Sequence, residues 1–279
     1  MSPPRSLAGR TLFVTGASRG IGLAIALRAA RDGANVVVAA KTTEVNARLP
    51  GTIHAAATAI EQAGGHALAV ACDVRDEAMV DAAIAAGVAR FGGIDILVSN
   101  ASAIGLTGTL ATPMKRVDLM FAVNTRGTFL CAQRCMPHLL ASAARGNNPQ
   151  MLTLSPPLDM QPRWFGPHVA YSIAKYGMSM CVLGMAEEFR GRGVGINALW
   201  PRTAIATAAL AMIPGIEAAQ CRTPEIVADA AHAVLTRDAR SSNGRFYIDD
   251  DVLREEGVHD FTRYAVDPGT PLRADLFVD

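Results

Sequence analysis

Short runs of apolar residues alternate along the chain with longer segments whose apolar positions recur every three or four residues. A short apolar run bounded by turn residues is typical of a buried strand, and a period near 3.6 is typical of an amphipathic helix. The runs that predict strands lie at residues 12–14, 35–40, 67–72, 94–98, 151–155, 194–199 and 246–248. Helical patterns separate them, which predicts an α/β domain with a parallel sheet and helices on both faces.

The longest helical pattern covers residues 113–140 and starts at Pro113, a residue suited to the first turn of a helix. Asn124 interrupts its apolar positions. An Asn inside an apolar helix either satisfies or bends the backbone, or belongs to a hydrated site. Both interpretations stay open at this point.

The composition argues against several classes of protein. Half of the 279 residues are apolar, 18% are charged, and the net charge at pH 7 is +1. This balance predicts no nucleic-acid surface and no membrane association, and no apolar run reaches the ~18 residues that span a bilayer. The first ten residues lack the apolar stretch of a secretory signal. We therefore expect a cytoplasmic protein.

The cysteines point to a reducing compartment, because they are five in number and four of them lie in apolar segments. Cys131 and Cys135 are one helical turn apart and could in principle share a metal ion. No histidine or carboxylate stands at a metal-binding spacing from them, so we expect buried thiols and no metal site.

A glycine-rich segment follows the first predicted strand and opens the first predicted helix. Backbone N–H groups in such a turn, together with the helix N-terminus, bind a diphosphate, which predicts a dinucleotide site. Gly16 would allow the tight turn, Gly20 the close approach of the phosphates and Gly22 the contact between helix and strand. The spacing differs from the commoner Gly-x-Gly-x-x-Gly, so an ordinary turn is the alternative. The segment consists of Gly16, Ala17, Ser18, Arg19, Gly20, Ile21 and Gly22.

The end of the second predicted strand indicates which dinucleotide binds. A carboxylate there binds a free ribose 2′-hydroxyl, whereas a cation accommodates a 2′-phosphate. Lys41 stands at this point, no carboxylate precedes Glu44, and Arg19 offers a second positive charge. NADP(H) is therefore favoured over NAD(H). The alternative is that both cations are solvated surface residues.

Three further strand ends carry residues suited to a ligand site. Asp73 and Val74 follow the third strand, and Asp73 either accepts a hydrogen bond from the adenine amino group or caps the next helix. Asn100 and Ala101 follow the fourth strand, where the backbone must pass close to a ligand. Ser155 ends the fifth strand, at the edge where open α/β sheets bind ligands.

Tyr171 and Lys175 open another helical pattern and face the same side of it because they are four residues apart. A phenol loses its proton near pH ~10, too high for a base at neutral pH. An ammonium about 4 Å away, at an effective dielectric constant of ~20, supplies the ~4 kcal/mol that would lower this pKa by about three units. The pair gains meaning only beside the glycine-rich turn, because its spacing alone is common.

Taken together, these motifs resemble the short-chain dehydrogenase/reductase family over residues 11–250. The resemblance implies a Rossmann-type fold and hydride transfer between a nicotinamide and a carbonyl or alcohol carbon. It implies that Tyr171 exchanges the substrate proton, Ser155 holds the substrate oxygen and Asn124 keeps a water for a proton relay. Lys175 would bind the nicotinamide ribose and lower the pKa of Tyr171.

The segment after the sixth strand also resembles the family. Pro201 and Thr203 match the stretch that packs on the nicotinamide, although Arg202 stands where the family usually has glycine. A second departure concerns the serine, which normally stands thirteen residues before the tyrosine, at the position of Leu158. Either the loop is three residues longer and Ser155 is functional, or Pro156 has taken the place of the serine and supplies no hydroxyl.

We therefore expect one domain over residues 1–279, with strand order 3-2-1-4-5-6-7, a core at 11–250, a substrate lid at 203–222 and a tail at 257–279. The tail should pack around the edge of the domain or on a neighbour. The expected activity is an NADP(H)-dependent oxidoreductase for a small carbonyl or alcohol substrate, acting as a homodimer or homotetramer. The alternative is a nicotinamide-nucleotide-binding regulatory or scaffold protein with little catalysis.

Overall fold

Seven parallel strands form a single sheet in the order β3-β2-β1-β4-β5-β6-β7, which confirms the predicted fold class and strand order. The computed structural model describes residues 5–45, 50–213 and 215–279. The strands are β1 (Thr11–Thr15), β2 (Asn35–Ala40), β3 (His66–Ala71), β4 (Ile96–Ser99), β5 (Gln150–Leu154), β6 (Gly195–Trp200) and β7 (Phe246–Ile248).

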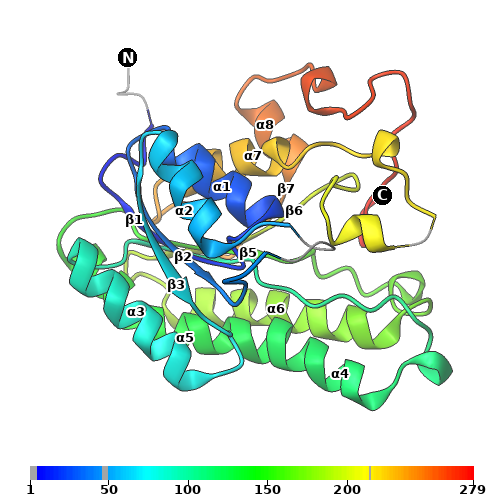
Figure 1. The fold of residues 1–279 in the computed structure, drawn as a ribbon, viewed down its shortest axis with the longest axis horizontal. Coiled ribbons are helices and arrows are strands. Elements are labelled where there is room, and N and C mark those ends of the chain that lie inside the picture. The colour runs from blue at the N-terminus through cyan, green and yellow to red at the C-terminus, as the bar shows by residue number, and fades with distance from the viewer. Residues whose placement is uncertain (1–4, 46–49, 214) are drawn as a thin grey trace.

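Two layers of helices cover the sheet (Figure 1). One layer contains α1 (Gly20–Ala30), α2 (Ile53–Gln62) and α7 (Glu225–Leu235), with α8 (Asp249–Glu255) beside α7. The other contains α3 (Glu77–Phe91), α4 (Met114–Met120), α5 (Gly127–Ala144) and α6 (Val169–Glu188). Short 3-10 helices lie at Thr109–Ala111, Pro162–Trp164, Leu210–Met212, Ala218–Gln220 and Thr262–Tyr264.

Alternation along the strands decides which layer each side chain enters. In β1, Leu12 and Val14 pack with Ile25 of α1, whereas Phe13 points to the other face and packs with Leu139 of α5. Parallel strands covered on both faces read as continuous apolar runs for this reason. Because β1 lies near the centre of the sheet, the glycine-rich turn that follows it lies near the middle of the edge formed by the carboxyl ends of the strands.

The helix expected at residues 113–140 is divided. Between α4 and α5 the backbone forms a π-helical turn, Phe121–Arg126, which contains Asn124. π-helical turns inside α-helices are frequent at functional sites. A single helix was expected, so the division by a widened turn was not predicted, although bending of the backbone was one of the interpretations left open for Asn124.

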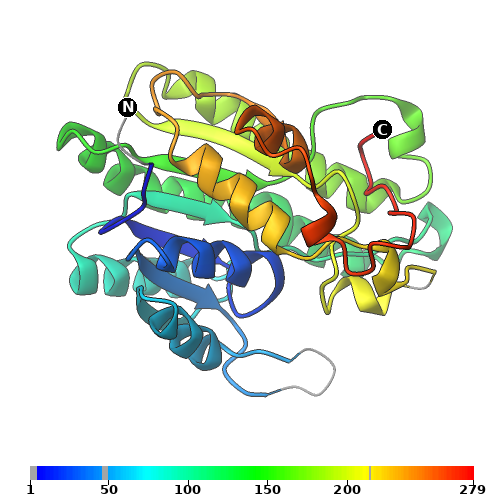
Figure 2. The same ribbon diagram turned by 90° about the horizontal axis from the view of Figure 1, so that it is seen from above.

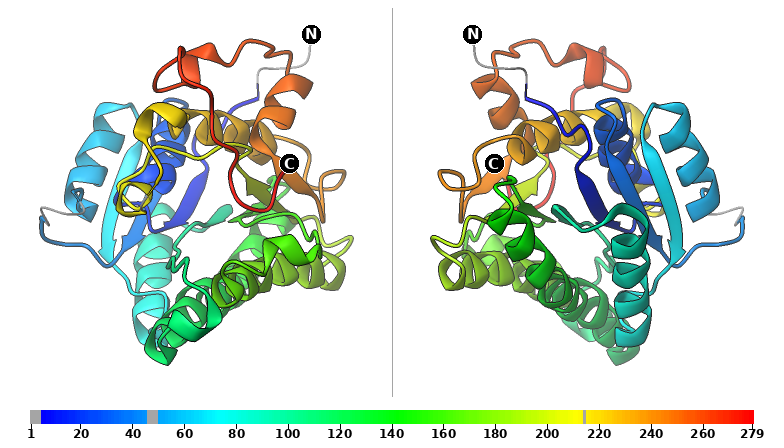
Figure 3. Two further views of the ribbon diagram at one scale, coloured as in Figure 1. Left: turned by 90° about the vertical axis from the view of Figure 1, so that its right-hand side faces the viewer. Right: turned by 90° about the vertical axis from the view of Figure 1, so that its left-hand side faces the viewer.

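The tail after Gly257 packs along the domain itself. Its last residues return to the carboxyl ends of the strands, beside the segment that follows β6 (Figure 2). Side views show the C-terminus over the same end of the sheet (Figure 3). The predicted lid, residues 203–222, includes residue 214, and the predicted signal-free N-terminus includes residues 1–4; these lie outside the described residues.

The cysteines are free thiols, and Cys131 and Cys135 are buried as expected. Burial raises the pKa of the Cys131 thiol to about 12, so it is not reactive at neutral pH. Within residues 5–45, 50–213 and 215–279, no helix is long and apolar enough to cross a membrane. The same residues include no group of three or more metal-ligating side chains.

Candidate active site

The glycine-rich turn is held by the side chain of Asn100, which follows β4. The Asn100 amide nitrogen Nδ2 donates to the carbonyl oxygens of Thr15, at 2.9 Å, and Gly16, at 3.3 Å. A Cβ on Gly16 would lie 3.0 Å from this nitrogen, and a Cβ on Gly22 would overlap it. Gly22 therefore leaves space for the Asn100 amide, and it also allows α1 to approach the Gly16 carbonyl just after β1, from which a Cβ would lie 3.0 Å away.

Two of the glycines also adopt backbone conformations that other residues rarely take. Gly16 has φ +68° and Gly20 has φ +59°. Asn100 and Ala101 both donate their backbone N–H to Thr15 Oγ1, at 3.0 Å. The sequence interpretation assigned no role to Thr15, although a Thr at the end of a strand beside such a turn is a signal for this contact.

The 2′-phosphate end of the predicted site is open. Lys41 follows β2 and is exposed, while Arg19 donates from NH2 to the carbonyl of Gly51 at 2.9 Å. Arg19 Nε is buried without a hydrogen-bond partner in the described part of the chain. Burial lowers the pKa of Arg19. A buried, unpartnered guanidinium nitrogen favours an anionic acceptor.

The segment before α2 supports this turn from the side. Gly51, at φ +105°, lies so close that a Cβ there would be 2.6 Å from the carbonyl oxygen of Ser18. On the opposite side the methyl group of Thr207 lies 3.4 Å from where a Cβ on Gly20 would be. Thr207 comes from the predicted lid, and nothing in the local sequence indicated that it would face the glycines.

Asp73 and Val74 follow β3 next to this turn. The Asp73 carboxylate accepts hydrogen bonds from Arg75 Nε at 2.9 Å and Arg75 NH2 at 2.5 Å, and these bonds lower its pKa. Helix α3 is capped by Asp76, which accepts from Met79 N at 3.1 Å, so Asp73 is not the cap. The Val74 side chain is buried against Gly127, which leaves its backbone as the part that can face a nucleotide.

Asn124 is fully buried in the π-helical turn, and its side chain is hydrogen-bonded to the loop after β4. Its Oδ1 accepts from Ala103 N at 2.7 Å and its Nδ2 donates to Ala103 O at 3.0 Å. Of the two interpretations left open, the contacts match the one in which the side chain satisfies backbone groups. The same turn holds α6, because Thr125 Oγ1 donates to Ala174 O at 3.0 Å.

Tyr171 and Lys175 lie on one buried face of α6, with 5% and 2% of their surfaces exposed. Lys175 Nζ donates to the carbonyl of Leu154 at 2.6 Å and lies 4.8 Å from the centre of the Trp200 ring. Burial lowers the pKa of Lys175 to about 7, and the Asp275 carboxylate acts in the opposite direction.

The pKa of Tyr171 lies above its ordinary value, not below it as the resemblance implied. Burial is the main cause, and the Asp275 carboxylate adds to it. The Lys175 ammonium points to Leu154 O and over Trp200, so it does not offset this burial. Lys175 does not lower the phenol pKa in this arrangement of the side chains, so its effect on Tyr171 stays a prediction.

Ser155 follows β5 and is buried, and its Oγ has no hydrogen-bond partner among the described residues. Leu158, thirteen residues before the tyrosine, packs against the cluster that contains Tyr171. Pro156 faces α6, where its carbonyl accepts from Ser179 Oγ at 2.6 Å. An unpartnered buried hydroxyl favours a ligand contact, because most buried polar groups are satisfied.

The segment after β6 is joined to the end of the chain. Pro201 is buried, and Thr203 is paired in an antiparallel bridge with Ala274. Arg202, the departure from the family pattern, donates from Nε to Asp250 Oδ1 at 2.7 Å, and its carbonyl accepts from Asp275 N at 2.9 Å. The residue that replaces the usual glycine therefore fixes the tail next to Tyr171.

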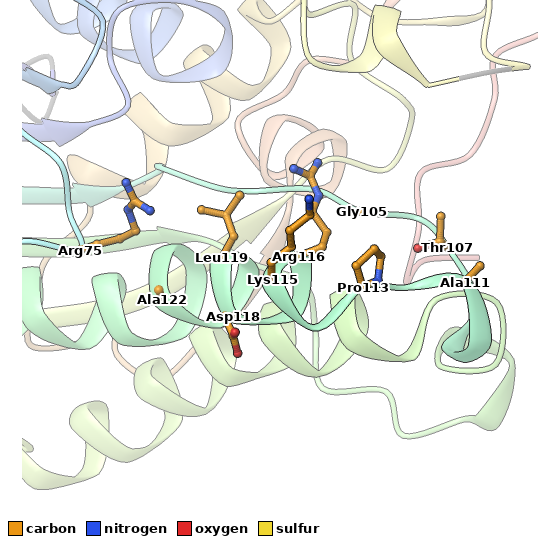
Figure 4. A pocket seen from close by; sticks show the side chains of 10 residues that line it. All are labelled: Arg75, Gly105, Thr107, Ala111, Pro113, Lys115, Arg116, Asp118, Leu119 and Ala122. Atoms are coloured by element: carbon orange, nitrogen blue, oxygen red, sulfur yellow. The ribbon is translucent and has the colours of Figure 1, made fainter.

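A hollow of about 860 Å³ beside α4 contains none of the predicted site residues. Arg75 and Arg116 extend toward the same side of the helix, and Asp118 points the other way (Figure 4). The Arg116 guanidinium already donates to the carbonyl of Ile104. The residues predicted to carry the chemistry, Tyr171 and Lys175, lie instead on the buried face of α6.

A family model described as short chain dehydrogenase matches residues 10–213. The chain belongs to the short-chain dehydrogenase/reductase family. Proteins of this family are oxidoreductases that bind nicotinamide cofactors.

Curated relatives cover nearly the whole chain. Hydroxysteroid dehydrogenase-like protein 2 of Danio rerio is 60% identical over 274 residues, and that of Homo sapiens is 56% identical over 275 residues. Each match covers 98% of this chain, but 65% of the zebrafish and 64% of the human protein, so the chain spans just under two thirds of their length.

A solved structure shows the same architecture. The crystal structure of a candidate dehydrogenase from Xanthomonas campestris is 61% identical, with a TM-score of 0.95, over 98% of this chain and 99% of that one. This match covers nearly all of both chains, whereas the family model ends at residue 213.

Proposed function

We propose that this reductase-family chain transfers a hydride between NADP(H) and a small carbonyl or secondary alcohol substrate, with Tyr171 as the proton donor and acceptor. The observation that carries the proposal is the pair Tyr171 and Lys175, buried together on α6 at the sheet edge where the glycine-rich turn also ends. The cytoplasm is the proposed location.

The residues around the turn fit a dinucleotide. Gly16 and Gly22 leave the space that the Asn100 amide occupies, Gly16 and Gly20 adopt positive φ, and the N-terminus of α1 has no side-chain cap and offers N–H groups to a diphosphate. Lys41 and Arg19 would bind the 2′-phosphate, Asp73 and Val74 the adenine side, and Pro201 and Thr203 the nicotinamide side. The bound nicotinamide supplies the hydride.

The chain's own residues handle the proton. When a carbonyl carbon receives the hydride, its oxygen takes a proton from the Tyr171 hydroxyl, and the reverse reaction returns it. The phenol holds this proton at neutral pH, and it releases the proton more readily the more the resulting tyrosinate is stabilised. Lys175 would stabilise the tyrosinate left behind, Ser155 would hold the substrate oxygen, and Asn124 would keep the loop after β4 in place.

Exposed apolar side chains support the proposed homo-oligomer. Phe129 on α5 and Met180 and Leu183 on α6 each have about half of their surface exposed. These helices lie on the outer side of one layer. A second copy of the chain would bury these side chains.

Residues 203–222 remain the proposed lid, since Thr207 reaches the glycine-rich turn from this segment.

A panel of ketones, aldehydes and acyl-thioester-linked carbonyls tests the proposal, with NADPH oxidation followed by absorbance. We expect turnover of at least one class, faster with NADPH than with NADH. The rival, a nucleotide-binding regulatory protein, is favoured by the proline that follows Ser155, and it predicts a thermal shift with NADPH but no turnover. No shift and no turnover would contradict both.

A further inference from the structure

The ring of Phe277 stands at the centre of an aromatic cluster that includes the proposed catalytic tyrosine. Only 2% of its surface is exposed. Its centroid lies 5–7 Å from the centroids of five other rings, the range of favourable aromatic pairs. The measured separations are 5.5 Å to Tyr176, 5.9 Å to Trp200, 6.1 Å to His168, 6.2 Å to Tyr171 and 6.3 Å to Trp164.

The backbone at Phe277 is strained. Its φ is +71°, and no other non-glycine residue in the described ranges has a positive φ. A residue with a large side chain adopts this conformation only where the surroundings enforce it, and such strain concentrates at functional sites. Packing an aromatic ring into a core does not require this conformation, because a residue with unstrained backbone at another position could place a ring there.

Hydrogen bonds on the preceding residues enforce this conformation. Ala204 N donates to Arg273 O and Asp275 N donates to Arg202 O, both at 2.9 Å. The Trp200 indole N–H donates to Leu276 O at 2.7 Å. Residues 273–277 are thus tied to the end of β6 and to the segment after it, and Phe277 is carried onto Tyr171.

These contacts connect the tail to both proposed catalytic side chains. Phe277 packs on Tyr171 directly, and it packs on Trp200, over whose ring the Lys175 ammonium lies at 4.8 Å. The indole of Trp200 has its N–H bonded to the tail and its face under the ammonium. Displacement of the tail would therefore move Trp200, over whose ring the Lys175 ammonium lies, and expose Tyr171 to water.

We propose that Phe277 is a positioning residue: it holds Tyr171 directly, and Lys175 through Trp200, in the arrangement that proton transfer to the substrate needs. The inference rests on the proposed function. It adds a residue more than a hundred positions beyond Tyr171, outside the segment 10–213 that the family model matches.

Phe277→Ala tests the proposal, with Phe277→Leu as the conservative variant and Leu272→Ala as the control. Leu272 lies on the same tail but is 37% exposed. We expect Phe277→Ala to lower kcat about 30-fold while Kd for NADPH stays within about twofold, because a 1 Å misplacement costs up to ~10²-fold. The solvent deuterium isotope effect on kcat should grow, since a poorly placed proton transfer limits the rate. Phe277→Leu should recover part of kcat, and Leu272→Ala should match the parent.

Unchanged kcat and isotope effect in Phe277→Ala, with only a lower melting temperature, would overturn the proposal and leave Phe277 as core packing. If Phe277→Ala does not fold, the same two quantities in Phe277→Leu decide. Turnover by the parent protein establishes the proposed function separately. If the parent protein shows no turnover, acrylamide quenching of Trp200 fluorescence, measured in a Trp164→Phe background, decides instead. Quenching that Phe277→Ala leaves unchanged would overturn the inference.

Discussion

The two ends of the site are built in different ways. At the nucleotide end, the contacts among the glycine-rich turn, Asn100 and Gly51 involve mainly backbone atoms and small residues, and Lys41 is open to water. At the chemical end, Tyr171 and Lys175 are enclosed by aromatic rings and by a tail from the far end of the chain. In the proposed function the first end would select by space and charge, and the second would depend on exclusion of water.

The nucleotide end should fail completely when its space is filled. In Gly22→Ala the added methyl group would overlap the Asn100 amide and crowd the Gly16 carbonyl, 3.0 Å away. We expect NADPH affinity to fall by about 100-fold or more, equivalent to ~3 kcal/mol, read as loss of the NADPH-induced thermal shift. Gly108→Ala is the matched control, because a Cβ there meets nothing within 4 Å. Parental affinity in Gly22→Ala would refute the assignment of this turn.

Charge at the same end should set the choice of cofactor. Lys41→Asp combined with Arg19→Ala removes two cations, each worth ~1.5–3 kcal/mol in a charged hydrogen bond. We expect the ratio of kcat/KM for NADPH to that for NADH to fall by about 10²-fold and the preference to reverse. Arg240→Asp combined with Arg192→Ala, the same charge change at two residues that line a different pocket, should leave the ratio as it is. A double variant that still prefers NADPH would show that other groups read the 2′-phosphate.

The chemical end should respond to pH instead. The Asp275 carboxylate opposes the lowering of the Lys175 pKa that burial causes. In Asp275→Asn this opposition is lost, so the pKa of Lys175 falls below about 7 and the ammonium loses its proton at lower pH. We expect the alkaline limb of kcat for reduction to move about one unit to lower pH, or ~1.4 kcal/mol.

Asp267→Asn provides the control for this shift, since Asp267 is an exposed carboxylate on the same tail that binds only Gly269 and Thr270. The alkaline limb of the kcat profile of Asp267→Asn should coincide with that of the parent protein. A limb that stays in place or moves to higher pH in Asp275→Asn would show that Asp275 does not act on Lys175.

The difference between the two ends also explains what the sequence could predict. The strand order, the glycine-rich turn and the face shared by Tyr171 and Lys175 follow from local periodicity and turn chemistry, and the structure has all three. The sequence does not decide whether Asp73 caps a helix or binds a ligand, because both roles use the same carboxylate. Asp76 takes the cap in the structure.

The chemical end could not be predicted in the same way. Its closure depends on contacts between residues far apart in sequence, such as Phe277 with Tyr171 and Leu276 with Trp200. No periodicity or motif in the tail indicates them. Arg202 was a visible signal, since an arginine in place of glycine needs partners, but the carboxylates of Asp250 and Asp251 that pair with it emerged only with the fold.

Tyr171→Phe tests the central claim most directly, because it removes one oxygen atom and leaves the ring packing intact. With the best carbonyl of the panel, kcat for NADPH oxidation should fall by about 10³-fold, within the range of general acid catalysis. The Kd for NADPH, measured by its fluorescence, should stay within about twofold. Substantial remaining turnover would show that another group donates the proton and would contradict the assignment of Tyr171.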